Sequence, residues 1–429
     1  MLKVASLVKN EVFSPRFFSI SGAKPNDRTK FPLDEQHRDL LNLMMSLHYI
    51  ECQYPLEKEL VLETRFVDLF KTIREDLERL FLLLTGKSIK LMLSPTRAHG
   101  SQTVLYEGGN SYPILLSGGV DSISGALKVL SRNPEGILLH INTSKVIFGK
   151  MKRVLTNKAF SRNQTYCISA GIKAKRHRSF FSNTRGLLFL TAGYVVSRFL
   201  RSGKVVFCEN GAQMLDIMLG SMAYDNAVST KNTNPRYLQA VNNLLSKFEN
   251  TSFEVDYTLK DATKSEAISE FLDKELLQKS WSCYSTRMRS EMCGSCWNCF
   301  ATKMSSIAAG FPETLRFEVD PLSDDLNSAF FSDNQRILYN MLVFYSNVIN
   351  RDEKVMSELE ECGDVFHKPE ELATRFALDL YLGVYGCLLK NSRKNGLGKK
   401  AEVLLSGIDL SLLDNRRESL AKLRSQRNK

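Results

Sequence analysis

The chain has 429 residues, of which 43% are hydrophobic, and a formal net charge of +11. This length and apolar content exclude disorder throughout and predict two or three structural units. Nine cysteines are too few for a disulfide scaffold in a chain of this size. The positive charge favours an anionic partner such as a nucleotide, a nucleic acid or an acidic protein, and a basic surface that only keeps the protein soluble explains it equally well.

The sequence lacks the patterns of exported and membrane-spanning proteins. Charged residues interrupt the apolar positions of residues 1–18, so no apolar signal core is expected there. The most apolar helical stretch, residues 186–200, is shorter than the roughly 20 residues that span a bilayer, and it contains Arg198. We therefore expect a soluble, cytoplasmic protein.

Residues 1–110 are expected to form an N-terminal accessory region. They contain no glycine-rich phosphate loop, but apolar residues recur at helical spacing from Phe66 to Leu84. Gly86 is placed to end this helix.

Residues 111–320 are expected to form an α/β core. The apolar run Tyr112–Leu116 predicts a buried strand that stops at a Ser-Gly-Gly turn, and residues 120–131 predict the helix that follows. A further helix is expected to begin near Thr184, and further strands are expected at residues 137–141, 166–169 and 205–208. This alternation predicts a parallel, doubly wound α/β sheet, with ligands at the carboxyl ends of its strands.

Residues 321–429 are expected to form a helical C-terminal region. Strong helical patterns occupy residues 337–349 and 372–389. The last stretch, from Arg416 to Lys429, is rich in arginine and lysine and predicts a frayed basic helix.

The hexapeptide Ser117-Gly118-Gly119-Val120-Asp121-Ser122 links the first core strand to its helix. An isolated glycine pair is most often a tight turn, but the strand before, the helix after and the two serines favour a phosphate site. Backbone N–H groups and the hydroxyls of Ser117 and Ser122 would cradle the phosphates, and Asp121 would order the helix start or hold Mg²⁺. The lysine of a Walker loop is absent.

Four cysteines, Cys283, Cys293, Cys296 and Cys299, lie within a short segment. Four thiolates complete a tetrahedral Zn²⁺ shell and leave no open position, so we expect a structural zinc site. An iron–sulfur cluster is the competing interpretation.

The hexapeptide resembles the signature of PP-loop ATP pyrophosphatases, which cleave ATP between the α and β phosphates and form an adenylated intermediate. The order of motifs resembles the 7-cyano-7-deazaguanine synthase family (QueC-like) over roughly residues 112–310. These motifs are the hexapeptide, Arg185-Gly186-Leu187-Leu188, Thr263-Lys264-Ser265-Glu266, Ser282-Cys283-Tyr284 and Cys293-Gly294-x-Cys296-x-x-Cys299. Members of that family adenylate 7-carboxy-7-deazaguanine, aminate it and dehydrate the amide to a nitrile.

The resemblance implies roles for individual residues. Ser117, Gly118, Gly119, Val120, Asp121 and Ser122 would bind the nucleotide of ATP. Arg185 and Lys264 match basic positions near it and would act with Asp121 in catalysis. Cations beside the α phosphate would stabilise charge as pyrophosphate leaves.

The chain departs from the family in its pocket and in its size. The segment from Glu209 to Gln213 replaces the segment that follows the corresponding strand in the biosynthetic enzyme, and we expect Glu209 and Asn210 to bind substrate. The two added regions resemble the enlarged synthase-like proteins of antiviral defence operons (Qat-like). That resemblance implies a partner protein's amine as the nitrogen nucleophile.

Two other functions stay open. One is the biosynthetic, nitrile-forming reaction with ammonia. The other is a nucleic-acid-binding scaffold with a degenerate nucleotide site, which the basic run Lys173, Lys175, Arg176, His177 and Arg178 and the basic C-terminal stretch favour. An intact hexapeptide argues against degeneracy.

Overall fold

The computed structural model describes residues 2–3, 16–19, 33–53, 59–96, 111–142, 145–169, 183–219, 233–283, 291–294, 296–318, 341–390 and 407–427. The chain folds into two compact units. Unit 1 contains Met1–Ser117, Val129–Phe207 and Thr230–Thr258, and unit 2 contains Gly118–Lys128, Cys208–Ser229 and Leu259–Lys429. Both units therefore combine segments that are distant in the sequence.

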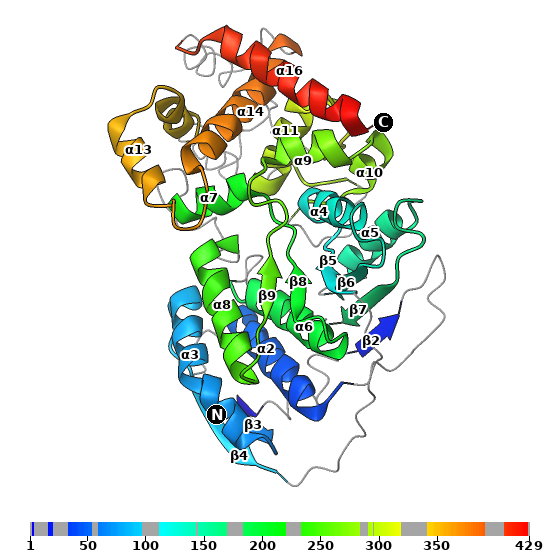
Figure 1. Cartoon of the computed structure of the whole chain (residues 1–429), viewed down its shortest axis with the longest axis vertical. Coiled ribbons are helices and arrows are strands. Elements are labelled where there is room, and N and C mark those ends of the chain that lie inside the picture. Colours follow the sequence, from blue (N-terminus) through cyan, green and yellow to red (C-terminus); the bar gives the residue numbers. More distant parts are fainter. Residues whose placement is uncertain are drawn as a thin grey trace. The chain divides into compact units, whose positions relative to one another are not determined.

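A six-stranded sheet forms the centre of unit 1 (Figure 1). Its order is β2 (Arg16–Ser19), β7 (Thr165–Ser169), β6 (Ile137–Asn142), β5 (Pro113–Leu115), β8 (Lys204–Val206) and β9 (Glu254–Asp256). The five strands from β7 to β9 are parallel, and β2 pairs antiparallel with β7 at the edge. The expected strands and the mixed α/β class are confirmed, whereas the sequence patterns missed β2 and β9.

Three helices of unit 1 follow strands of this sheet in the sequence. They are α5 (Lys145–Leu155), α6 (Arg185–Phe199) and α8 (Pro235–Phe248). Helix α6 is buried along most of its length, and it approaches the sheet closely at Gly193. A Cβ atom on Gly193 would lie 2.6 Å from a methyl carbon of Val205 in β8, so a larger residue there would push the helix away.

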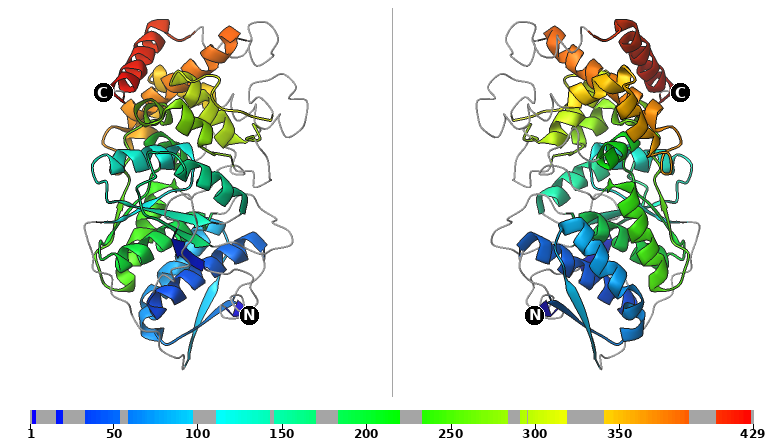
Figure 2. Two further views of the ribbon diagram at one scale, coloured as in Figure 1. Left: turned by 90° about the vertical axis from the view of Figure 1, so that its right-hand side faces the viewer. Right: turned by 90° about the vertical axis from the view of Figure 1, so that its left-hand side faces the viewer.

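The N-terminal region adds a second, three-stranded parallel sheet to unit 1. Its order is β1 (Leu2–Lys3), β3 (Glu59–Thr64) and β4 (Lys90–Pro95). Helices α2 (Glu35–Gln53) and α3 (Val67–Thr85) accompany it, and they contact α6 and α8 respectively (Figures 1 and 2). The expected end of α3 is confirmed, because Gly86 adopts a left-handed φ of 67° and donates its N–H to the carbonyl of Leu82.

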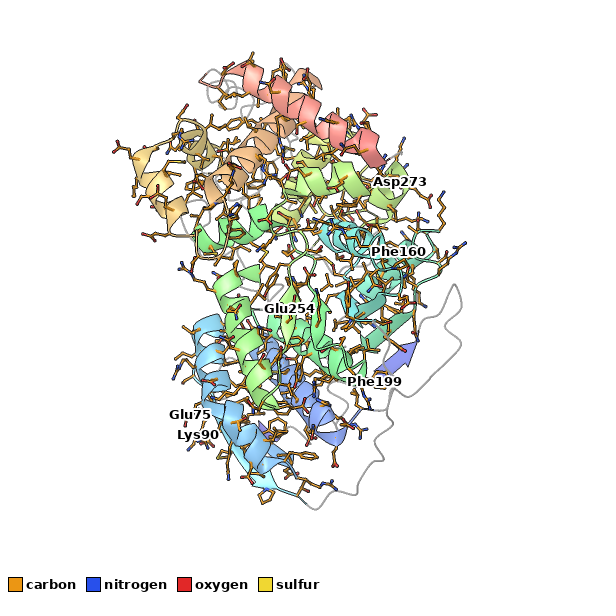
Figure 3. The ribbon with its side chains drawn as sticks, in the orientation of Figure 1. Glu75, Lys90, Phe160, Phe199, Glu254 and Asp273 are labelled. Atoms are coloured by element: carbon orange, nitrogen blue, oxygen red, sulfur yellow. The ribbon has the colours of Figure 1, made fainter. Side chains whose placement is uncertain are left out.

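In unit 2, every described secondary-structure element other than isolated β-bridges is a helix. The unit contains α4 (Val120–Leu130, up to Lys128), α7 (Gly211–Leu219), α9 (Lys264–Phe271), α10 (Lys274–Lys279), α11 (Trp297–Ala308), α13 (Glu353–Glu360), α14 (Pro369–Lys390) and α16 (Leu410–Arg427). Residues 341–349 are also helical. Asp273, labelled in Figure 3, caps α10 by accepting the N–H of Leu276 at 2.7 Å.

The described elements of the C-terminal region are helical as expected, but the last basic stretch differs from a frayed helix. The described residues of this stretch, 416–427, belong to α16, which is helical through Arg427 and buries Leu413, Arg416 and Leu420. Helix α14 packs closely on α11 through a glycine, since a Cβ on Gly383 would lie 2.8 Å from the backbone of Met304. No helix in the described part of the chain combines the length and the apolar character needed to cross a bilayer.

Candidate nucleotide site and four-cysteine cluster

The glycine loop leads directly into helix α4. Gly118 has a left-handed φ of 87°, a conformation that favours glycine. The hydroxyl of Ser122 accepts the N–H of Gly118 at 3.2 Å and donates to the carbonyl of Gly119 at 2.9 Å. Ser122 therefore holds the loop in shape. Ser117, the other serine of the hexapeptide, is the last residue of its segment in unit 1.

Residues just before the first cysteine brace this loop. The N–H of Trp281 donates to the carbonyl of Gly118 at 2.8 Å. The hydroxyl of Ser282 accepts the N–H of Val120, the first residue of α4, at 3.1 Å. The segment that leads into Cys283 thus fixes both the loop and the start of the helix, a relationship between two motifs that the sequence does not reveal.

Asp121 forms a buried ion pair with Lys264. The ammonium of Lys264 lies 2.7 Å from Asp121 Oδ2, and the side chains of Lys264 and Asp121 are only 5% and 13% exposed. The amide of Asn210 donates to the other oxygen, Asp121 Oδ1, at 3.0 Å. Asp121 therefore contacts two other residues expected at the site, Lys264 and Asn210.

Asn210 is held in place by the start of helix α7. Its Oδ1 accepts the N–H of Gln213 at 2.9 Å. The next residue, Gly211, donates its N–H to the carbonyls of Leu259 and Ala262, and a Cβ on it would lie 1.5 Å from the carbonyl oxygen of Lys260. The backbone beside Asn210 consequently requires glycine. The assignment of Glu209 and Asn210 to substrate binding stays a prediction.

Lys264 is the first residue of α9, and a capping box fixes its backbone. The Thr263 hydroxyl accepts the N–H of Glu266 at 3.2 Å, and the Glu266 carboxylate accepts the N–H of Thr263 at 2.8 Å. The pattern Thr-x-x-Glu is a known sequence signal for this arrangement. The same four residues that carry the family resemblance thus also define the helix start.

Residues from the C-terminal helices surround this capping box. Arg375 of α14 donates to both carboxylate oxygens of Glu266, at 2.6 and 2.8 Å. Arg416 of α16 donates to Glu266 at 2.8 Å and to both oxygens of Asp379 at 2.7 and 3.1 Å. Burial alone would raise the pKa of Glu266, but the charges of Arg416 and Arg375 outweigh burial and hold the pKa below its usual value. The sequence patterns did not single out Arg375, Asp379 or Arg416.

Arg185 belongs to unit 1, where it is the first residue of α6. Its guanidinium carbon lies 5.9 Å from the centroid of the Phe189 ring, one turn along the same helix. Its catalytic role stays a prediction. The basic run at residues 173–178 and Tyr284 lie outside the described residues.

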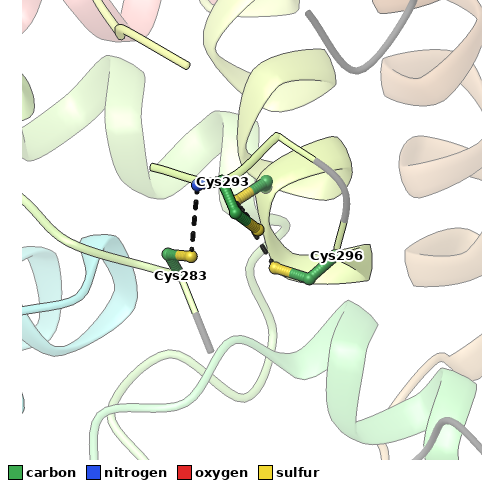
Figure 4. Close-up of side chains that lie close together, drawn as sticks. Cys283, Cys293 and Cys296 are labelled. Atoms are coloured by element: carbon green, nitrogen blue, oxygen red, sulfur yellow. Dashed lines mark hydrogen bonds between the residues drawn. The ribbon is translucent and has the colours of Figure 1, made fainter. Parts of the chain in front are cut away.

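The four cysteines lie together at the start of α11 (Figure 4). Their sulfur atoms all lie within 4.8 Å of one another. Cys299 Sγ is 3.4 Å from Cys296 Sγ and 3.8 Å from Cys293 Sγ, and the N–H of Cys293 donates to Cys283 Sγ at 3.4 Å. Tetrahedral zinc with Zn–S bonds of about 2.3 Å places its sulfurs about 3.8 Å apart, so the donor set fits Zn²⁺.

Ionisation of all four thiols would require a cation. Hydrogen bonding to the neighbouring sulfurs, with Cys283 the strongest contributor, raises the pKa of the Cys296 and Cys299 thiols well above its usual value. Four thiols this close cannot all ionise unless a positive charge compensates them. Their buried surroundings, formed with Met292, Leu315 and Phe317, suit a closed structural site.

Comparison with known proteins agrees with these features. Residues 141–309 match a family model described as queuosine biosynthesis protein QueC. The matched range includes Lys264 and all four cysteines and begins after the glycine loop. No curated protein matches the chain. The match supports a QueC-like PP-loop family for this part of the chain, and with it an ATP-utilising, nucleotide-binding enzyme.

Proposed function

We propose that this protein uses ATP to activate the carboxylate of a 7-deazaguanine acid and then transfers the acyl group to a nitrogen nucleophile. A carboxylate oxygen attacks the α phosphorus, the bond to the β phosphate breaks, and pyrophosphate leaves. The nitrogen then attacks the acyl carbon, AMP leaves with the bond electrons, and the nitrogen loses a proton. The observation that carries the proposal is the buried contact between Asp121 and Lys264 at the glycine loop, within a chain that matches QueC.

Each group of this site has a role that its chemistry supports. The positive N-terminal end of α4 attracts the phosphate oxygens of ATP, and Ser122 and Ser282 hold the loop at this end of the helix. The ammonium of Lys264 stabilises the negative charge that grows on the phosphates as pyrophosphate departs. Asp121 fixes the position of Lys264, and Asn210 fixes the position of Asp121.

Magnesium fits this donor set. Mg²⁺ in nucleotide sites is bound by one or two carboxylates together with the phosphates of the substrate. Asp121 is the carboxylate of the loop. Its Oδ2 pairs with Lys264, and its Oδ1 accepts one hydrogen bond from Asn210 and has a second lone pair for a metal. Asp121 would therefore hold the Mg²⁺ of ATP, which neutralises phosphate charge when bound.

We assign the nucleophile to the amine of a partner protein, in an antiviral defence system. The departure of the Glu209–Gln213 segment from the biosynthetic family and the two added regions support this assignment. Free ammonia, as in a nitrile-forming synthase, is the alternative. The mass of the product separates them, because amide formation adds the acid less one water to the partner protein.

Incubation with ATP and 7-carboxy-7-deazaguanine, followed by nucleotide and mass analysis, tests the first step. We expect AMP and pyrophosphate, and Ser117→Ala and Lys264→Met should each reduce their formation by about 100-fold. The exposed Lys260 supplies a matched control, and Lys260→Met should retain the wild-type rate. Formation of ADP and orthophosphate, or salt-sensitive nucleic-acid binding without nucleotide turnover, would contradict the proposal.

A further inference from the structure

Four charged side chains form a compact cluster beside Lys264. They are Glu266 of α9, Arg375 and Asp379 of α14, and Arg416 of α16. The side chains of Arg416, Glu266 and Asp379 are 5%, 9% and 2% exposed, and that of Arg375 is 36% exposed. The two positive charges balance the two negative charges, so removal of one partner would leave an uncompensated charge in a buried place.

Arg416 makes more contacts in this cluster than one ion pair requires. Its guanidinium binds Asp379 through two nitrogens and also donates to Glu266 at 2.8 Å and to the Thr263 hydroxyl at 3.3 Å. The planar guanidinium supplies several donors in fixed directions, which an ammonium cannot reproduce. Arg416 therefore joins three elements that are far apart in the sequence.

The two capping-box residues that Arg416 contacts lie on either side of Lys264. Thr263 precedes it and Glu266 follows it, and both hold the backbone of the first helical turn. The Lys264 side chain extends from this turn to Asp121. A change in the capping box would therefore move the ammonium relative to the glycine loop.

We propose that Arg416 is a positioning residue for Lys264, so that the C-terminal helix α16 is a structural part of the nucleotide site. The inference rests on the proposed function in one respect, namely that Lys264 binds ATP. It gives α16 an internal role instead of the partner-docking role that an added helical region suggests. The more exposed Arg375 supports the same capping box through its hydrogen bonds to Glu266.

The first test measures the environment of Lys264 without any turnover. In the full-length protein, Lys264 should resist acetylation by a lysine reagent, as followed by peptide mass analysis, because it is buried and paired. Arg416→Met and Arg375→Met should each increase its acetylation rate by about tenfold or more, and Arg416→Lys should give an intermediate rate. Arg417→Ala changes the neighbouring arginine, which is 54% exposed and pairs with the exposed Asp414, and it serves as the matched control.

The second test is a double-mutant cycle on ATP binding. Arg416→Met should weaken ATP binding by about tenfold, and in a Lys264→Met background it should add little, because both changes remove the same interaction. If the Arg416→Met protein does not fold, the same measurement is made on Arg375→Met. Additive effects, or unchanged acetylation of Lys264 in folded Arg416 and Arg375 variants, would overturn the inference. If the wild-type protein forms no AMP and pyrophosphate, only the proposed function is overturned, because the acetylation experiment does not depend on ATP turnover.

Discussion

Glu51 of α2 caps the start of helix α6 at Thr184. Its carboxylate accepts the backbone N–H groups of Asn183 at 2.6 Å and of Thr184 at 2.9 Å, and the Thr184 hydroxyl also donates to it. A helix N-terminus carries partial positive charge, which an anion stabilises. The N-terminal region thus supplies the anion that the first turn of α6 needs, directly before Arg185.

Replacement of Glu51 by Gln should destabilise unit 1. The neutral amide of glutamine loses the charge interaction with the helix N-terminus, and its single oxygen cannot replace both carboxylate oxygens as hydrogen-bond acceptors. We therefore expect the free energy of unfolding to fall by about 1–2 kcal/mol. Chemical denaturation measures the change. Glu75→Gln is the matched control, because Glu75 lies on α3 (Figure 3) and is 80% exposed. The unfolding free energy of this variant should stay within about 0.5 kcal/mol of the wild type.

Asp121→Ala should cost both nucleotide chemistry and stability. The change leaves the buried ammonium of Lys264 without its carboxylate, and loss of one partner from a buried pair typically costs about 3–5 kcal/mol. The double variant Asp121→Ala, Lys264→Met should recover much of the stability and none of the AMP formation. Thermal unfolding and product analysis on the same samples check both parts. A fully stable Asp121→Ala protein would show that the pair is not buried in solution.

Metal analysis of the purified protein should find about one zinc per chain. Cys296→Ser should lower the zinc content and the free energy of unfolding together, because a structural zinc site contributes its binding energy to folding. Since Ser282 braces Val120 one residue before Cys283, ATP binding should weaken in the same variant.

Cys362→Ser provides the control for this experiment. Cys362 is buried but lies outside the cluster, where its thiol donates to the carbonyl of Glu358. We expect full zinc content in this variant. Iron with inorganic sulfide and a brown colour in the wild-type protein would show that the four cysteines hold an iron–sulfur cluster.

His140 should make the stability of unit 1 depend on pH. It is fully buried in β6, its Nδ1–H donates to the carbonyl of Leu116 at 2.9 Å, and burial lowers its pKa from 6.5 to about 4. The unfolded chain therefore binds a proton at higher pH than the folded chain does. This contribution to stability is complete above pH 6.5 and is lost as the pH falls toward 4, by roughly 3 kcal/mol in total.

The variant His140→Asn isolates this contribution. Its side chain can still donate to the Leu116 carbonyl, but it does not titrate. The free energy of unfolding of the wild type should fall more steeply than that of the variant between pH 6.5 and 4.5, where most carboxylates remain ionised. Parallel pH curves for the two proteins would contradict the buried, neutral imidazole.

Local patterns in the sequence predicted the centre of the fold. The run Tyr112–Leu116, the glycine pair and the helix after it depend on neighbours in the chain, and the structure has β5 and α4 at those positions. The four-cysteine cluster could also be predicted from the sequence, because metal ligands are recognised by residue type and spacing. The family resemblance placed Asp121 and Lys264 each near the nucleotide, but it did not predict their direct contact.

Contacts between distant residues were beyond the reach of sequence patterns. Arg416 and Arg417 are adjacent and chemically identical, yet the first is buried in a charged cluster and the second is exposed. Nothing local distinguishes them, because the difference arises from Asp379 and Glu266 on other helices. Strand β2 was missed for a similar reason, since its pairing partner β7 lies far along the chain.

The bracing of the glycine loop by Ser282 has a consequence for how the protein folds. Val120 and Ser282 are 162 residues apart, and Glu266 and Arg416 are 150 residues apart. Contacts across such separations form only after long loops have closed, which makes folding slow. During refolding, helices should therefore appear well before the ability to bind nucleotide, and a partly folded chain would have no working loop with which to consume ATP.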